Sequence, residues 1–428
     1  MLLARALQRN PEMVETAIDL HQSGAIPGDC YLIDLDAIAH NARLMAEEAR
    51  RHNLRTYLMT KSHNRNPYVT AVALGQGLDS TVAVDAMEAR VLDRFGLPVG
   101  HAGHLSNLAK NSVADILAME PEVVTVFTYE AARNVSEAAR ALGRDQALYV
   151  RVNKPGDECF RGMVGGWTED ECVEGIRPIL DLPNVHIAGL TTFVNISYQT
   201  TDAASAQPTD SFFTMLRAKE KLEQAFGLED LRVNAPGNNN CATFATLAEH
   251  GATDVEPGIG LMGSSLAHAH GELPEKPAQV YVSEVMHHWE GEAYVLVGGL
   301  AYYTGISGGP NEYPIRCATG STFEKARDNF MTLASRGLPV GHGVCEDGSN
   351  GEVGDTAVFA LRAQLYGNRA PVAIVSGISS GEPRVDGLFD SAANALDENF
   401  EPIPPRIVIE RMRESVVARY TSAAGSAA

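Results

Sequence analysis

The sequence has few basic residues and no long apolar run. Lys and Arg total 34 against 54 Asp and Glu, and the formal net charge is -20. Phosphate contacts need a basic face, so this balance argues against a nucleic-acid partner. Apolar runs such as 123–127 and 293–297 are far shorter than the roughly 20 residues of a membrane helix. We therefore expect a protein that binds neither nucleic acid nor membrane.

Paired cysteines are also missing. The six cysteines are scattered without a CxxC spacing, which is typical of reduced thiols rather than of a disulfide framework. The first 24 residues read as one or two helices ending at Gly24, and Arg, Glu and Asp interrupt their apolar residues too often for a secretion signal. A cytoplasmic location is the expectation.

Short β-branched runs alternate with helical patterns through the first two thirds of the chain. The helical patterns each end at or near a glycine, a common helix stop. Eight such β/α units predict an α/β fold of the (β/α)8 TIM-barrel type. The eight strand candidates are 54–60, 79–84, 97–101, 122–128, 147–153, 185–193, 231–235 and 253–257, of which 97–101 and 253–257 carry the weakest signal.

The pattern changes after Pro274 to strand-like runs with Gly and Pro turns, at 278–285, 292–299, 353–366 and 370–378. This texture predicts a mostly β C-terminal domain. One more strand and helix start, 30–36, precedes the eight units. The predicted domains are a helical extension (1–29), the barrel (30–275), the C-terminal β domain (276–420) and a loose tail (421–428).

Lys61 stands at the carboxyl end of the first predicted barrel strand, where barrel enzymes place catalytic groups. A lysine that ends an apolar strand can be kept out of water, which makes its neutral amine available for imine chemistry. The alternative is a solvated lysine at a strand end.

Two glycine-rich loops follow the last two predicted strands. Residues 256–265 read EPGIGLMGSS, and residues 234–243 read NAPGNNNCAT and lead into a helix. Barrels often bind phosphate in these loops, through exposed backbone N–H groups. Glycines also make simple turns, so either loop alone is weak evidence. A lysine after strand one, next to phosphate loops after strands seven and eight, is a specific combination.

The chain resembles the YhfX-type family of alanine-racemase-like (fold type III) pyridoxal-phosphate enzymes. The residues that carry the resemblance span nearly the whole chain: YLMTK and NRNP around Lys61, VAVD and EARV in 82–91, GLPVGHAGHL (96–105), VTVFT, NAP (234–236), ATDVEPG (252–258), VSEVMHHWEGEAY (282–294) and SGISSGEPRVDGLFDS (376–391).

The resemblance implies pyridoxal 5'-phosphate as cofactor and assigns roles to particular residues. Lys61 matches the Schiff-base lysine, which also acts as an acid/base at Cα. Gly258 and Ile259 match phosphate-binding backbone, and the side chain of Asn240 or Thr243 is expected to add a phosphate contact.

Arg161 resembles an arginine of the class near cofactor and substrate, where a guanidinium suits a carboxylate. A surface arginine on a glycine-rich loop is the equal alternative.

At two positions the chain departs from the class. Glu256 stands where racemases usually have the arginine next to the pyridine nitrogen, and Thr192 stands where the class tends to have a histidine. A carboxylate would keep the nitrogen protonated and widen the chemistry beyond racemisation. Glu256 pointing into the barrel wall is the alternative.

Racemisation needs a second acid/base on the opposite face of the substrate. Alanine racemases supply a tyrosine from the C-terminal domain of the partner subunit, which implies a homodimer. Near that position the chain offers His287 and His288, and also Tyr302 and Tyr303. Histidine titrates near neutral pH, so we favour His287 or His288 over Tyr302. Adjacent residues of a strand face opposite ways, so only one histidine enters a given site.

Some enzymes of this fold, the D-threonine aldolases and D-serine dehydratases, carry a metal. His342 and Cys345 are the nearest candidate ligands here, but they lie in a Gly-rich loop without an evident ligand context, so no metal is expected.

The leading prediction is an isomerase, a pyridoxal-phosphate-dependent amino-acid racemase or epimerase that removes the Cα proton through a Lys61 aldimine. The alternatives are a lyase or dehydratase acting on a D-amino acid, similar to D-threonine aldolase, and a non-catalytic pyridoxal-phosphate-binding protein. The large C-terminal domain counts against the last alternative.

Overall fold

The computed structural model describes residues 1–200, 202–300, 315–336, 341–347, 350–362 and 365–421. The chain folds into two compact units. The barrel unit comprises Ala42–Lys61 and Gln76–Gly260, and the sheet unit comprises Met1–Asn41, Ser62–Gly75 and Leu261–Ala428. Among the described helices none is both long and apolar enough to cross a membrane.

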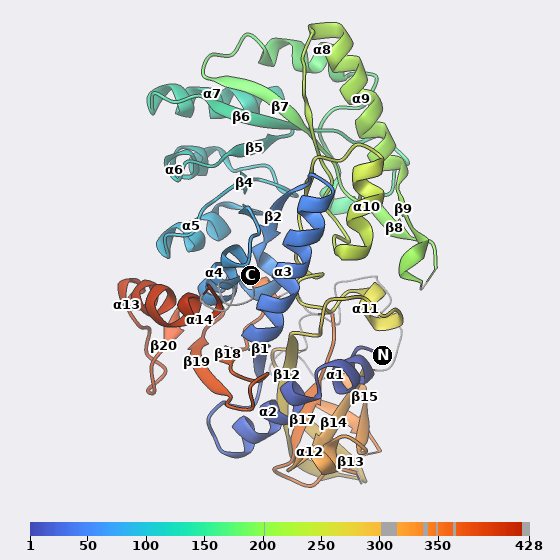
Figure 1. Ribbon diagram of the computed structural model, residues 1–428, viewed down its shortest axis with the longest axis vertical. Coiled ribbons are helices and arrows are strands. Elements are labelled where there is room, and N and C mark those ends of the chain that lie inside the picture. Colours follow the sequence, from blue (N-terminus) through green and yellow to red (C-terminus); the bar gives the residue numbers. More distant parts are fainter. Residues whose placement is uncertain (201, 301–314, 337–340, 348–349, 363–364, 422–428) are drawn as a thin grey trace. The chain divides into compact units, whose positions relative to one another are not determined.

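Eight parallel strands close into a barrel in the barrel unit, in the order β10-β11-β2-β3-β4-β5-β6-β7. Figure 1 shows β4, β5, β6 and β7 of this barrel side by side. Each of the eight predicted barrel strands overlaps an observed strand, and the two with the weakest sequence signal are the two-residue strands β4 and β11; the prediction 97–101 shares only His101 with β4. The strands are β2 (Arg55–Met59), β3 (Ser80–Ala83), β4 (His101–Ala102), β5 (Val123–Val126), β6 (Gln146–Arg151), β7 (Val185–Thr191), β10 (Arg232–Asn234) and β11 (Asp254–Val255).

Several helices of the barrel unit begin at a residue whose side chain caps them. Asp85, Thr128 and Thr209 accept hydrogen bonds from the first backbone N–H groups of α5, α7 and α9, which satisfies donors that a helix start leaves unpaired. The helices are α5 (Ala86–Arg94), α6 (Val113–Ala118), α7 (Tyr129–Ala141), α8 (Cys172–Ile176), α9 (Asp210–Phe226) and α10 (Cys241–Glu249); α3 (Leu35–Arg51) crosses from one unit into the other. A hairpin of β8 (Ile196–Tyr198) and β9 (Ala206–Pro208) follows β7.

Charged and phenolic groups fill the barrel interior at the amino ends of the strands. Arg232 forms an ion pair with the buried Asp254 and donates a hydrogen bond to the Tyr57 hydroxyl at 3.1 Å. The Tyr149 hydroxyl donates to Asp254 at 3.1 Å, and the Tyr57 hydroxyl donates to Glu122 at 3.1 Å. These groups satisfy one another's hydrogen bonds, so the amino end of the barrel has a structural role. The carboxyl ends of the strands are then the end at which a site is expected.

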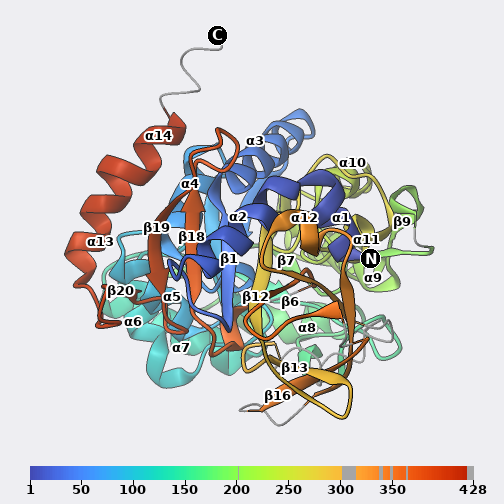
Figure 2. The ribbon, with the colours of Figure 1, turned by 90° about the horizontal axis from the view of Figure 1, so that it is seen from below.

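The sheet unit holds a ten-stranded sheet in the order β13-β16-β15-β14-β17-β12-β1-β18-β19-β20, and β13 also pairs with β12. Figure 2 shows β1 between β12 and β18. The strands are β1 (Cys30–Asp34), β12 (Gln279–Trp289), β13 (Glu292–Leu296), β14 (Ile315–Gly320), β15 (Phe330–Arg336), β16 (His342–Glu346), β17 (Thr356–Phe359), β18 (Val372–Ser376), β19 (Arg384–Phe389) and β20 (Ala395–Leu396). Its helices are α1 (Leu2–Arg9), α2 (Pro11–Gln22), α4 (Pro67–Gly75), α11 (Leu266–His270), α12 (Phe323–Ala326), α13 (Pro405–Arg411) and α14 (Ala418–Thr421).

This arrangement differs from the predicted domain boundaries. The prediction placed residues 30–275 in the barrel domain, but β1 pairs antiparallel with β12 and parallel with β18. All five residues of β1 are buried, which suits a central strand covered on both faces. A strand followed by a helix looks the same in sequence whichever sheet it joins, so the local pattern could not reveal this partner.

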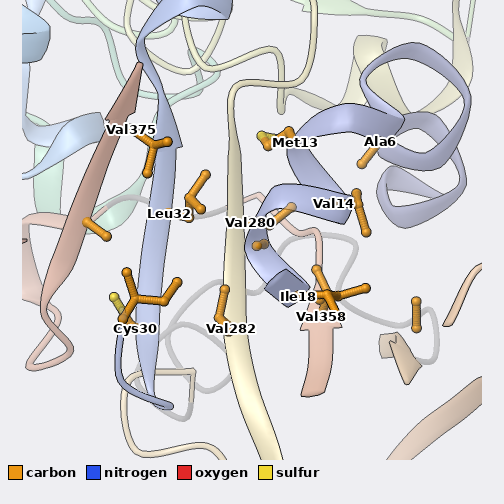
Figure 3. Close-up of a cluster of buried hydrophobic side chains, with 14 of the residues drawn as sticks. Ala6, Met13, Val14, Ile18, Cys30, Leu32, Val280, Val282, Val358 and Val375 are labelled. Carbon is orange, nitrogen blue, oxygen red and sulfur yellow. The ribbon is translucent and has the colours of Figure 1, made fainter. Parts of the chain in front are cut away.

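The N-terminal helices are part of the core of the sheet unit. Figure 3 shows Met13, Val14 and Ile18 of α2 pointing toward Val280 of β12 and Val358 of β17. All five side chains are buried. Helix α2 therefore covers the sheet and stabilises the fold of this unit.

We predict that Ile18→Ala lowers the free energy of unfolding by about 3 kcal/mol, because it removes buried methyl groups and leaves a cavity. Urea denaturation measures this effect. Glu15→Ala on the exposed side of the same helix is the matched control and is expected to change stability by less than about 0.5 kcal/mol. Equal effects of the two substitutions would contradict the packing of α2 against the sheet.

Candidate active site

Polar side chains gather at the carboxyl ends of the barrel strands, the end at which barrel enzymes place their sites. Lys61 lies in the short 3-10 helix Thr60–His63 that follows β2, and Glu256 follows β11 directly. Strands β2 and β11 are hydrogen-bonded neighbours. The Met59 backbone N–H donates to the Pro257 carbonyl at 2.8 Å, so the segment that carries Lys61 and the segment that carries Glu256 meet where the barrel closes.

Glu256 is a buried carboxylate with unequal oxygens. Its Oε1 accepts hydrogen bonds from His101 Nδ1 at 2.7 Å and from Asn234 Nδ2 at 2.8 Å. Its Oε2 has no hydrogen-bond partner among the described residues and lies 3.5 Å from His104 Nε2. The prediction left open whether Glu256 meets the pyridine nitrogen or points into the barrel wall and pairs elsewhere. In the structure one oxygen is paired with His101 and Asn234, and the other has no hydrogen-bond partner among the described residues.

Two histidines from the end of β4 flank this carboxylate, and they differ in their hydrogen bonds. His101 uses both ring nitrogens, with Nδ1 at Glu256 and Nε2 2.6 Å from Thr125 Oγ1. Neither nitrogen of His104 makes a hydrogen bond to the described residues. Burial holds the pKa of His104 well below its usual value, and the neighbouring His101, Arg151 and Lys61 lower it further. His104 is therefore neutral at physiological pH.

The arginine of this cluster is Arg151, the last residue of β6, and it is fully buried. Its Nε donates to Asn153 at 3.0 Å and its Nη2 to the Met163 carbonyl at 2.9 Å, whereas Nη1 has no hydrogen-bond partner in the described part of the chain. Burial lowers the pKa of this guanidinium to about 10, which the neighbouring Cys159 and Glu256 partly oppose by raising it, so the group remains charged at neutral pH. The predicted arginine, Arg161, is exposed on the 3-10 helix Arg161–Met163.

The two glycine-rich loops are tied to each other. The Glu256 backbone N–H donates to Asn239 Oδ1 at 2.8 Å. A Cβ added at Gly260 would lie 2.3 Å from the Asn239 carbonyl oxygen, so only glycine permits this close approach. The loops after β10 and β11 thus form one backbone surface, which includes the buried Gly258 and the partly exposed Ile259.

Asn240 and Thr243 cap the start of a helix in this structure. Asn240 accepts from the Ala242 N–H at 3.0 Å, and Thr243 Oγ1 accepts from the Asn240 N–H at 3.1 Å. This reciprocal capping box starts α10. Asn240 Nδ2 also donates to the Tyr198 hydroxyl at 2.7 Å. A phosphate contact from either side chain stays a prediction, and the backbone of the two loops is the better candidate.

The remaining predicted residues lie in the sheet unit or outside the described residues. His287 is exposed on β12 and stacks on Tyr294 with ring centroids 4.5 Å apart, and the neighbouring His288 is also exposed. Tyr302 and Tyr303 lie outside the described residues. The two considered metal ligands, His342 and Cys345, are three residues apart on β16; His342 is exposed and Cys345 is buried. They face opposite sides of the sheet and cannot bind one ion together.

Thr192 is buried and accepts a hydrogen bond from Asn153 Nδ2 at 3.1 Å. His101, His104, Arg151 and Asn234 were not predicted as site residues from the sequence. A sequence signal was present for each, because each is a polar or charged residue near the carboxyl end of a predicted barrel strand or shortly after it. Both histidines lie in the segment GLPVGHAGHL.

Comparison with known proteins agrees with this architecture. Residues 33–266 match the model of the alanine racemase N-terminal domain, and residues 280–385 match that of the YhfX-like C-terminal domain. The chain is 33% identical to YhfX of Escherichia coli K12, over 92% of this chain and 100% of that protein.

The chain belongs to the YhfX family of alanine-racemase-like proteins.

The class to which this family belongs, fold type III, is pyridoxal-phosphate-dependent and includes both racemases and lyases. A more distant relative, the 3-hydroxy-D-aspartate aldolase of Paracoccus denitrificans, is 26% identical over 42% of this chain and 44% of that protein. Among solved structures, D-threonine aldolase from Filomicrobium marinum has a TM-score of 0.64 at 17% identity, covering 86% of this chain and 96% of that one. This structural likeness confirms the predicted fold, a parallel barrel with a mostly β C-terminal part.

We predict a pH-dependent stability from His104. Its pKa is lower in the folded protein than in the unfolded chain, so below about pH 6.5 the unfolded chain binds a proton that the folded protein does not. Stability is therefore lost as the pH falls through that value. Replacing His104 with Phe removes this contribution, so the stability of the wild type relative to His104→Phe should fall by about 1 kcal/mol between pH 7 and pH 5.5. Urea denaturation of the cofactor-free protein at the two pH values measures it, and identical pH dependence in both proteins would contradict a buried neutral His104.

Proposed function

We propose that this protein is a pyridoxal-phosphate-dependent enzyme that removes the proton from Cα of an amino acid, and that it works as a racemase or epimerase. The observation that carries the proposal is the placement of Lys61 and Glu256 at the carboxyl ends of two neighbouring barrel strands. Around them, buried polar atoms of Glu256, His104 and Arg151 have no hydrogen-bond partner among the described residues.

The residues present fit the cofactor. Pyridoxal phosphate offers a ring nitrogen that can carry a proton, a phenolic oxygen, an aldehyde and a phosphate. Glu256 Oε2 is an open acceptor for a ring N–H, and Arg151 Nη1 is an open donor for an anionic oxygen. Lys61 supplies the amine that would hold the aldehyde carbon covalently. The backbone of Gly258 and Ile259, beside the start of α10, would hold the phosphate.

The cofactor, when bound, withdraws electrons from Cα and so makes its proton removable. The chain's own groups do the rest. Lys61 Nζ takes the proton from one face of Cα, and a second group returns a proton to the opposite face, so configuration inverts and composition stays the same. Buried Glu256 stabilises positive charge at the ring nitrogen, because a carboxylate in a dry site favours an adjacent proton.

The second group is proposed to be His287 or His288 of the partner subunit in a homodimer. Both side chains are exposed on β12, so they are accessible to another chain. The proposed substrate is an amino acid or a derivative of one, and the proposed location is the cytoplasm.

A lyase or dehydratase acting on a D-amino acid is the second candidate. Glu256 favours it specifically, because a carboxylate at the ring nitrogen strengthens electron withdrawal and supports reactions beyond racemisation. The relatives named as a 3-hydroxy-D-aspartate aldolase and a D-threonine aldolase point the same way. Product analysis separates the two candidates: the opposite enantiomer indicates a racemase, whereas glycine with an aldehyde, or ammonia with a keto acid, indicates a lyase or dehydratase.

We predict that the purified protein binds pyridoxal phosphate through Lys61. Its absorption band near 410–430 nm should disappear on borohydride reduction, and peptide mapping should place the label on Lys61. In Lys61→Ala the label should be lost, and exchange of Cα deuterium from a panel of D- and L-amino acids should fall at least about 1,000-fold. Lys154→Ala, an exposed lysine of the same unit, is the control. A colourless protein that takes up no cofactor would sink the proposal.

We predict that removing the second acid/base separates exchange from inversion. For the histidine that fills this role, substitution by Phe should leave Cα deuterium wash-out from one enantiomer intact while the opposite enantiomer no longer forms, because Lys61 still serves its own face. His287→Phe and His288→Phe serve as controls for each other, since adjacent strand residues face opposite sides. Chiral chromatography with mass detection measures both quantities. Full racemisation in both variants would exclude the two histidines.

A further inference from the structure

His104 is the described histidine of the barrel unit for which the structure shows no internal role. It is fully buried, yet neither ring nitrogen makes a hydrogen bond to the described residues. A buried polar group without a partner costs about 1–3 kcal/mol, so most buried side chains are satisfied. The nearby His101 is the informative contrast, because Glu256 and Thr125 satisfy both of its nitrogens. His101 therefore has an evident structural task, and His104 does not.

Another buried atom without a hydrogen-bond partner lies beside His104. Its Nε2 lies 3.5 Å from Glu256 Oε2, which also has no hydrogen-bond partner among the described residues. That separation is too long for a good hydrogen bond, so the two groups do not satisfy each other. Arg151 and Lys61 lie close enough for their charges to act on His104. The rings of His104 and Phe193 also meet edge to face, with centroids 6.1 Å apart, and this contact restrains the orientation of His104.

The protonation state of His104 defines what it can bind. Every charged or titratable neighbour named above, apart from Glu256, disfavours a second proton on the ring, as does burial. A neutral imidazole offers one N–H donor and one acceptor nitrogen. Together with the acceptor at Glu256 Oε2 and the donor at Arg151 Nη1, these side chains are complementary to a ligand that carries an N–H group and an oxygen on one edge. The pyridinium ring of pyridoxal phosphate has this arrangement, because its phenolic oxygen is on the carbon meta to the ring nitrogen.

We propose that His104 is a cofactor-binding residue, whose neutral imidazole contacts the polar edge of the pyridine ring next to Glu256. The inference rests on the proposed function, since it takes the bound ring to be that of pyridoxal phosphate. His104 and Glu256 then act together: the carboxylate accepts the N–H of the ring, and the imidazole completes the hydrogen bonding of the same edge. A single direct contact of this kind affects cofactor affinity and the absorption of the bound ring, whereas a packing role would affect neither specifically.

The test compares three variants of the full chain: His104→Asn, which keeps a donor and an acceptor, His104→Phe, which keeps the volume without hydrogen bonds, and His104→Ala. Titration of the cofactor-free proteins with pyridoxal phosphate gives the dissociation constant, and the absorbance maximum of the bound cofactor is the second readout. We expect about tenfold or greater weakening and a shifted maximum in the Phe and Ala variants, with affinity within about threefold of the wild type in the Asn variant. His186→Phe, at the exposed start of β7, is the control and should bind as the wild type does.

Unchanged affinity and absorbance in His104→Phe and His104→Ala, with Lys61 still labelled by borohydride, would overturn this inference and leave the proposed function intact. A wild-type protein that takes up no pyridoxal phosphate would overturn both. Should His104→Ala fail to fold, the Phe and Asn variants decide the question, because both fill most of the space of the imidazole.

Discussion

Closure of the barrel between β2 and β11 is the constraint on which the rest of the site depends. The parallel pairing of these two short strands, continued by the hydrogen bond from the Met59 N–H to the Pro257 carbonyl, joins the first barrel strand to the last. Lys61 and Glu256 are far apart in sequence and become neighbours only through this closure. Since parallel strands end on one face, the groups carried by the other strands meet there as well.

The second feature that organises the site is Glu256, whose two carboxylate oxygens have different surroundings in the barrel interior. His101 and Asn234 fix one oxygen of Glu256, so the side chain cannot turn to satisfy the other. In a medium of low dielectric constant an unsatisfied oxygen interacts strongly with any donor that reaches it. The fold thus tolerates polar atoms without partners at the carboxyl end of the barrel, whereas Arg232, Asp254, Tyr57 and Tyr149 satisfy one another at the amino end. Buried polar atoms without partners break the usual rule of hydrogen-bond satisfaction, and such exceptions are expected at functional sites.

Features that depend on residues close together in the chain could be predicted from the sequence, whereas features that depend on contacts between distant segments could not. The barrel strands were predictable because each is a short apolar run whose pattern is local. The sheet partners of β1 were not, since they come from β12 and β18, far along the chain. The same limit explains why Arg161, and not Arg151, was predicted from the sequence. Arg161 has the expected glycine-rich neighbourhood but is exposed, while Arg151 is buried because it ends β6 inside the barrel. Asn240 fits a phosphate loop in sequence, and its helix-capping role appears only when the loop is folded.

By itself the sequence determined the fold class, the number of barrel strands, the mostly β character of the C-terminal part and the positions of Lys61 and Glu256 after the first and last barrel strands. These follow from local patterns and from residue order along the chain. Tertiary structure alone decided which oxygen of Glu256 is anchored, that both nitrogens of His104 lack hydrogen bonds to the described residues, and that Arg151 supplies the buried guanidinium. Burial and hydrogen-bond partners depend on distances between residues from different strands, and these distances exist only once the barrel has closed.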